Sequence, residues 1–249
     1  MMYIARHEWL QFFRTPFGWV LLGLSQVILG LAYYILLNNY YQKLKFAVPG
    51  RGISYEVVGL LVAILLYLAL FIVPLAASRL IAYERRQNTL ALYLLSPTST
   101  WQIVLGKYLG LFAFVACLLV PVVAVALLLG LSSQLDWGVV MASLLAGALL
   151  LAAYSAIALF CSSVFRQPLL AGLIASLILL AFILLDLLAD TRIDWLDQAL
   201  AFVSIVRHFE ALLNGLIRIG DVAFFAWLAL LFLGLSYWQI RRLRFARCN

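Results

Sequence analysis

The chain contains 249 residues, of which 67% are apolar and 11% are charged, and its formal net charge is +7. Soluble domains have about 45–50% apolar and about 25% charged residues, so the composition excludes an ordinary soluble enzyme, a disordered chain and a secreted disulfide scaffold. The composition instead predicts a polytopic, all-α integral membrane protein.

The first predicted element is a short amphipathic helix within residues 1–16. Apolar residues recur at i, i+4, i+7 and i+8, and polar residues fall on another face. We expect this helix to lie in the membrane interface, either as an anchor or as a docking element for a partner. Its apolar face contains Ala5, Trp9, Phe12 and Phe13, and its basic residues are Arg6 and Arg14. Thr15 and Pro16 predict an N-cap and the first residue of the next helix.

Six membrane spans are predicted after this helix. A helix needs roughly 20 apolar residues to cross the ~30 Å hydrocarbon core. Six stretches meet that requirement, at approximately Phe17–Leu37, Val57–Ala77, Tyr108–Leu131, Val139–Val164, Leu169–Leu188 and Val222–Ile240. No soluble domain is apparent between them, so we expect one transmembrane domain over residues 1–249.

The basic residues predict how the spans are oriented. An even number of spans places both termini on one side, and that side holds eleven of the Lys and Arg residues against six on the other. The positive-inside rule therefore places both termini in the cytoplasm. Among the acidic residues, only Glu8 and Glu84 share that side. The basic run at Arg241–Arg244 favours anionic lipid, rather than nucleic acid, as a binding partner.

The loop at residues 78–106 is the most informative segment between spans. We expect the second helix to continue past the membrane, with Glu84, Arg85 and Asn88 on a solvent-facing surface. A short apolar helix then ends at Pro97, and Ser99 with Gln102 predicts a capping box for the third span. The basic residues alone are explained by topology, but an ordered apolar helix beside them favours a docking element.

Polar residues within the spans are few. Gln26 and Tyr33 help to make the first span the most polar one, which fits a helix that faces a pore or a second subunit. Asp186 lies about one turn from the outer end of the fifth span. We consider it either part of an exit path or an acid at the membrane interface.

The outer segment at residues 189–220 combines helical apolar spacing with charged residues. It is too polar to span the membrane and too apolar to be free in water, so it predicts one or two amphipathic or re-entrant helices on the outer face. Its ionisable residues include Asp194, Asp197, Arg207, His208 and Glu210.

No motif for catalysis, a metal or a nucleotide is present in the sequence. HExxH, CxxC and GxSxG are absent, and Trp101 occupies the position at which a Walker A loop ending at Gly106–Lys107 requires glycine. We therefore expect no catalytic residues and no cofactor in this chain. If it were an enzyme, the candidate residues would be Asp190, Asp194, Asp197, His208 and Glu210.

The sequence resembles the ABC-2 type permeases, the membrane subunits of ABC transporters. The hallmark follows the second span and reads Glu84, Asn88-Thr89-Leu90-Ala91, Leu94-Leu95-Ser96-Pro97 and Ile103-Val104-Leu105-Gly106-Lys107. Asn88 replaces the usual glycine and Ala91 the usual acid. The outer motif His208-Phe209-Glu210, followed by Gly215 and Asp221-Val222, is similar to the gliding-motility-type branch.

The resemblance implies partners and roles for these segments. Two permease subunits, identical or related, would pair in the bacterial cytoplasmic (inner) membrane, and each would contact an ATPase subunit that binds ATP and Mg. The coupling residues would be Glu84, Arg85, Asn88, Thr89, Leu90, Leu94, Ser96 and Pro97. Arg6, Trp9, Phe12, Phe13 and Arg14 would form the interface helix. A pathway or outer gate would include Gln26, Tyr33, Asp186, His208, Phe209 and Glu210.

Three functions are compatible with these features. The first is a permease subunit that moves a substrate when a separate ATPase drives it. The second is a non-transporting scaffold or mechanotransmitting subunit of an envelope complex. The third is a membrane-embedded lipid-modifying enzyme, which needs clustered acids or a His/Ser set at the interface.

Overall fold

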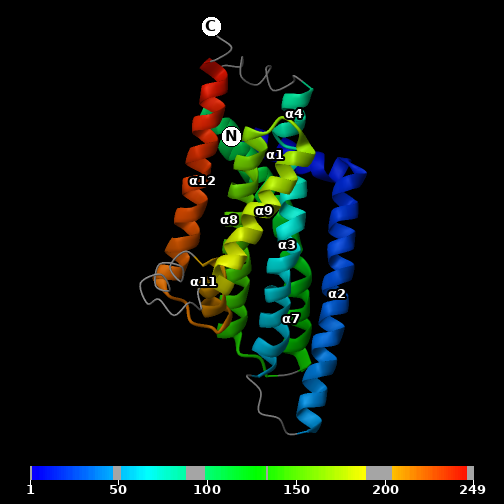
Figure 1. Cartoon of the computed structure of the whole chain (residues 1–249). Helices are drawn as coiled ribbons and strands as arrows, with labels where there is room; N and C mark the ends of the chain where they lie inside the picture. The colour runs from blue at the N-terminus through cyan, green and yellow to red at the C-terminus, as the bar shows by residue number, and fades with distance from the viewer. Residues whose placement is uncertain (1, 47–51, 88–98, 133, 189–203, 246–249) are drawn as a thin grey trace.

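A computed structural model describes residues 2–46, 52–87, 99–132, 134–188 and 204–245, and every regular element in these ranges is helical. Within these ranges, six helices are long and apolar enough to cross a membrane, and they run along the long axis of an elongated bundle (Figure 1). The predicted polytopic all-α fold is thereby confirmed.

The elements follow the chain in the order that the apolar runs predict. They are α1 (Met2–Arg14), α2 (Pro16–Lys45), the π-helix η1 (Ser54–Gly59), α3 (Leu60–Ser78), α4 (Ala82–Arg86), α6 (Thr100–Ala116), the 3₁₀-helix η2 (Cys117–Leu119), α7 (Val120–Ser132), α8 (Trp137–Val164), α9 (Pro168–Leu188), α11 (Ile205–Leu213) and α12 (Ile219–Phe245). One end of the bundle carries α1, α4 and the C-terminal end of α12, and is called the terminal end below (Figure 1).

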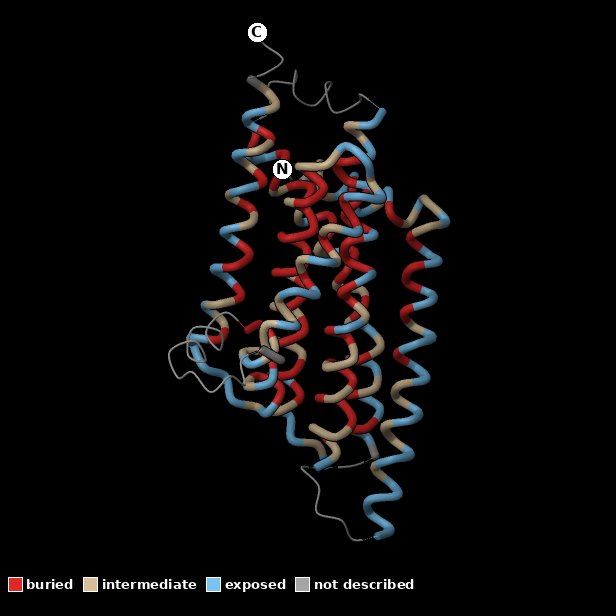
Figure 2. Tube along the Cα trace, viewed as in Figure 1, coloured by how far each residue is buried: buried red, intermediate tan, exposed pale blue. Residues whose placement is uncertain are grey.

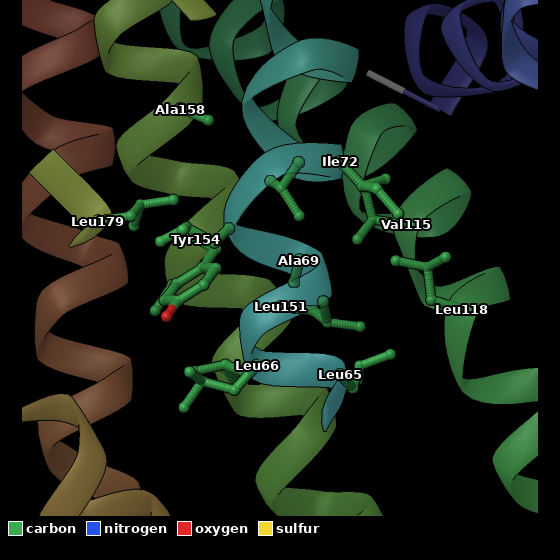
Figure 3. Packing of buried hydrophobic residues seen from close by; sticks show 14 of the residues in the cluster. Leu65, Leu66, Ala69, Ile72, Val115, Leu118, Leu151, Tyr154, Ala158 and Leu179 are labelled. Carbon is green, nitrogen blue, oxygen red and sulfur yellow. The ribbon is translucent and has the colours of Figure 1, made fainter. Parts of the chain in front are cut away.

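Helices α3 and α8 form the centre of the bundle. They are the most buried spans, whereas α2, α9 and much of α12 expose apolar side chains outward (Figure 2). Leu65, Leu66 and Ala69 of α3 lie against Leu151 and Tyr154 of α8 (Figure 3). Small residues on α8 allow this approach, because a Cβ added at Gly147 would lie 2.9 Å from Leu119 Cδ2 and 3.3 Å from Val62 Cγ1.

Helix α2 is longer than its apolar stretch. It continues eight residues past Leu37, through polar residues that keep helical geometry beyond the membrane core. Near that end, Lys43 Nζ lies 2.5 Å from Glu56 Oε2 in η1, so an ion pair ties α2 to the start of the second span. Pro16 begins the helix as predicted. Thr15 holds the N-cap position, but its hydroxyl donates to Phe12 O at 3.1 Å instead of capping α2.

The third span is interrupted by Pro121. A proline lacks the amide that the carbonyl four residues earlier requires, and its ring crowds that carbonyl. The chain therefore tightens into the 3₁₀-helix η2, in which the amide of Val120 bonds to Cys117 O. Gln26 Nε2 from α2 also donates to Cys117 O, at 3.4 Å. The side chain predicted to face a pore or a second subunit thus bonds to the backbone of the neighbouring span.

Candidate functional site

Lys107 is the main polar residue inside the terminal end. It lies two turns into α6, and its side chain is 0% exposed. The ammonium donates to Glu8 Oε1 of α1 at 2.5 Å, to Glu84 Oε1 of α4 at 2.7 Å and to Leu80 O at 3.1 Å. One ammonium of α6 therefore contacts α1, α4 and the segment that connects α3 with α4. We call Glu8, Lys107 and Glu84 the ion cluster.

The geometry explains how a charged lysine can be buried at this depth. An ammonium has three donors, and the three oxygen atoms above satisfy all of them. Glu8 and Glu84 are themselves largely buried, with side-chain exposures of 3% and 16%. Removal of one member of a buried ion pair typically costs about 3–5 kcal/mol, because the remaining charge loses its partner. The three side chains consequently depend on one another.

From the sequence, Lys107 is a basic residue on the side of the termini and the last residue of the Ile103-Val104-Leu105-Gly106-Lys107 motif, and nothing predicts that it is buried. The signal that was missed is that Glu8 and Glu84 are the two acids on the side of the termini, and both bind this lysine. The two partners are separated from it by 99 and 23 residues. A sequence pattern within one helix cannot show that residues this far apart in the chain are in contact.

Helix α1 packs closely onto α6. At Gly110 an added Cβ would lie 2.7 Å from Glu8 Cβ and 3.0 Å from Ala5 O, so only glycine fits there. The rings of Phe12 and Phe114 stack with centroids 4.4 Å apart. The predicted helix is confirmed, and Phe12 of its predicted apolar face is buried. The predicted face is wrong at two positions: Trp9 is 37% exposed, and Glu8, which is not part of that face, is buried. Packing against α6 selects the buried face, and both Arg6 and Arg14 are exposed.

Helix α4 is bonded to the end of α8. Arg85 Nη1 donates to Ser163 O at 2.6 Å and to Val164 O at 2.9 Å. In return, Ser162 Oγ of α8 accepts from the amides of Ile81 and Ala82, at 3.2 and 3.1 Å. The first amides of α4 and the last carbonyls of α8 have no partners within their own helices, and these contacts supply hydrogen bonds to both.

These contacts correct the predicted solvent-facing surface of the second helix. Glu84 turns inward to Lys107, and Arg85 caps α8, so neither lies on a freely solvated face. Charged residues this close to the end of an isolated helix would face water, but here unsatisfied backbone carbonyls and a buried ammonium bind them. Tyr83, Arg86 and Gln87 are exposed in this segment.

The rest of the predicted coupling motif falls largely outside the described residues. This applies to Asn88, Thr89, Leu90, Leu94, Ser96 and Pro97. The description resumes at Ser99, where the predicted capping box is confirmed: Ser99 Oγ accepts from the amide of Gln102, and Gln102 Oε1 accepts from the amide of Ser99. This box fixes the start of α6, two turns before Lys107.

The predicted outer residues do not form one site. At the end opposite to the ion cluster, Asp186 of α9 accepts from Ser204 Oγ at 2.9 Å and from Arg207 Nε at 3.1 Å. His208 Nδ1 lies 2.6 Å from Asp221 Oδ1, at the start of α12. Helix α11, which confirms one predicted outer helix, is therefore held between α9 and α12.

The other predicted pathway residues have separate surroundings. Phe209 is buried in the core, Glu210 is exposed, and Tyr33 is half-buried on α2, so the structure does not bring these three together. Asp190, Asp194 and Asp197 lie outside the described residues. Across the part of the chain that the structure describes, no group of three or more His, Cys, Asp and Glu side chains is arranged to hold a metal ion.

Comparison with models of known protein families places the chain in a family. A family model described as ABC-2 family transporter protein matches residues 38–238, from the far end of α2 into α12. The matched region contains Glu84, Arg85 and Lys107, whereas α1 with Glu8 precedes it. No curated protein matches the chain.

Proposed function

Because this chain belongs to the ABC-2 family of transporter proteins, we propose that it is a permease subunit driven by a separate ATPase that docks at the terminal end. The observation that carries the proposal is the ion cluster, which joins α1, α4 and α6 to one another at that end. A topology signal alone requires basic residues, not an ordered hydrogen-bonded arrangement of this kind.

The need for a partner follows from energetics. A pump must bias two conformations with an energy source, and a protein without one cannot shift its own equilibrium. The sequence contains no nucleotide-binding motif. In this proposal the ATPase binds ATP and Mg, contacts α4 and the motif that follows it, and its closure displaces these elements. A second permease subunit completes the membrane part.

The distribution of charge supports an orientation for this complex. Arg79, Arg85, Arg86 and the basic end of α12 lie at the terminal end, which the positive-inside rule places in the cytoplasm. An ATPase that uses cytoplasmic ATP would meet α4 there. The bacterial inner membrane and the likeness to the gliding-motility-type branch are parts of the same proposal.

Copurification tests the docking. The tagged chain, extracted from its native membranes in mild detergent, should carry an ABC ATPase and a Mg-dependent ATP hydrolysis that vanadate inhibits. Leu94→Glu in the coupling motif should remove both. The matched control is Leu216→Glu, because Leu216 is an exposed leucine just after α11, and α11 lies away from the terminal end (Figure 1).

Two outcomes contradict the proposal. One is a functional chain that purifies without an ATPase. The other is an ATPase that stays bound to Leu94→Glu as strongly as to the Leu216→Glu control, which would show that docking does not use the coupling motif.

A further inference from the structure

We infer that Lys107 is a positioning residue that makes α1 follow α4, so that a displacement imposed on α4 also moves the interface helix. This inference rests on the proposed function, because it concerns how a force from the ATPase spreads through the membrane subunit. It assigns to α1 the role of a driven element rather than that of a passive anchor.

The packing divides the terminal end into two groups of helices. Helix α1 packs mainly on α6 and α2, whereas α4 packs on α8 and α9. The ion cluster crosses this division: Glu8 belongs to the first group, and Glu84 belongs to the second. Lys107 Nζ is the atom that both carboxylates contact. A displacement of α4 therefore reaches α1 directly through this ammonium.

The three acceptors of Lys107 are divided unevenly between the two groups of helices. Two of the three oxygen atoms around Lys107 come from the segment that ends in α4, namely Leu80 O and Glu84 Oε1. The lysine is thus held firmly to that segment. Glu8 of α1 supplies the third contact. In this inference, the contact between Lys107 and Glu8 transmits the displacement to α1. Of the three contacts, only the one with Glu8 involves α1, so a substitution of Glu8 removes that contact and leaves the other two.

Burial makes the connection stiff. Lys107 is fully buried, and Glu8 is nearly so, hence water cannot replace either partner when the other moves away. Exposed ion pairs exchange their partners for water at little cost. A buried pair favours the movement in which both charges stay together, and that movement carries α1 along with α4.

The experiment measures the displacement of each element separately. Spin labels are placed at Gln11 of α1 or at Gln87 beside α4, both of which are exposed, with a reference label at exposed Met141 of α8. Cys117, Cys161 and Cys248 are replaced first, so that labelling is specific. Pulsed electron paramagnetic resonance then compares the copurified complex without nucleotide and after trapping with ATP and vanadate.

Glu8→Ala is the decisive variant. It separates α1 from the ion cluster and leaves Lys107 with Glu84 and Leu80 O, so no buried charge loses all of its partners. In the parent complex, trapping should change both distances. In Glu8→Ala, the change at Gln87 should persist, and the change at Gln11 should disappear or fall several-fold. Arg6→Ala, which alters an exposed residue of the same helix, should behave like the parent.

The outcomes separate this inference from the proposed function. If trapping leaves Gln87 in place in the parent complex, the proposed function fails. If Gln87 moves in the parent but Gln11 stays in place, or if Gln11 still moves fully in Glu8→Ala, the inference is wrong. Should Glu8→Ala fail to assemble, Glu8→Gln removes the charge at the same size, and an undiminished change at Gln11 in that variant also overturns the inference.

Discussion

The guanidinium of Arg85 caps the C-terminal end of α8, with Nη1 donating to Ser163 O at 2.6 Å. A cation at this position also interacts favourably with the negative end of the helix dipole. The contact fixes where α4 stands relative to the central helix of the bundle.

Arg85→Ala should therefore destabilise the protein. Loss of hydrogen bonds from a charged donor costs about 2 kcal/mol, which lowers the melting temperature of a chain of this size by roughly 4–8 °C. Arg86→Ala removes the same charge from an exposed neighbour and should change stability little. Thermal unfolding of the detergent-solubilised chain gives the comparison. Equal shifts for the two variants would contradict the capping role.

Ser162 and Ser163 form a matched pair for a second prediction. Ser162 Oγ accepts from the amides of Ile81 and Ala82, whereas Ser163 Oγ donates to Phe160 O within its own helix. Ser162→Ala leaves buried amides without an acceptor and should cost about 1–3 kcal/mol. Ser163→Ala should be nearly neutral. Thermal unfolding again measures the difference, and a larger loss for Ser163→Ala would refute this account.

Gly110→Ala should displace α1. The new Cβ would lie 2.7 Å from Glu8 Cβ, and overpacking of this kind costs about 1–3 kcal/mol. If this free energy is lost locally, amide hydrogens in α1 should exchange about tenfold faster. Hydrogen–deuterium exchange of the peptide covering α1 measures the effect. The control is Gly234→Ala, because an added Cβ at Gly234 meets no atom within 4 Å; unchanged exchange of α1 in Gly110→Ala would count against the close contact.

Gln26 and Pro121 should be energetically coupled. Gln26→Leu removes the bond to Cys117 O and should cost about 1 kcal/mol. Pro121→Ala restores an amide that Cys117 O can accept from, so Gln26→Leu should cost less in that background. A double-mutant cycle on thermal stability measures the coupling. Additive effects of the two substitutions would mean that Gln26 does not compensate for the proline.

The sequence predicts features that depend on neighbouring residues. The six spans follow from long apolar runs, and the capping box of Ser99 and Gln102 follows from two residues three positions apart. Both kinds of signal act within one helix or one turn, so they can be recognised without knowing how helices pack.

Features that depend on packing between distant segments were not predictable in the same way. Glu84 and Lys107 are separated by 23 residues, and their contact depends on how α4 and α6 are placed in the bundle. Likewise, the buried face of α1 is set by Gly110 and Phe114 on another helix, not by its own periodicity. An isolated helix offers the charges near its ends no partner but solvent, so the sequence alone predicts a solvated surface for Glu84 and Arg85.

The length of α2 makes the protein sensitive to bilayer thickness. Thirty residues extend about 45 Å at a rise of 1.5 Å each, well beyond the ~30 Å hydrocarbon layer. The excess is polar, and its ion pair between Lys43 and Glu56 lies beyond the apolar part of the helix. A thicker bilayer would draw these charges toward the acyl chains, and α2, which stands at the edge of the bundle, would respond by reducing its tilt.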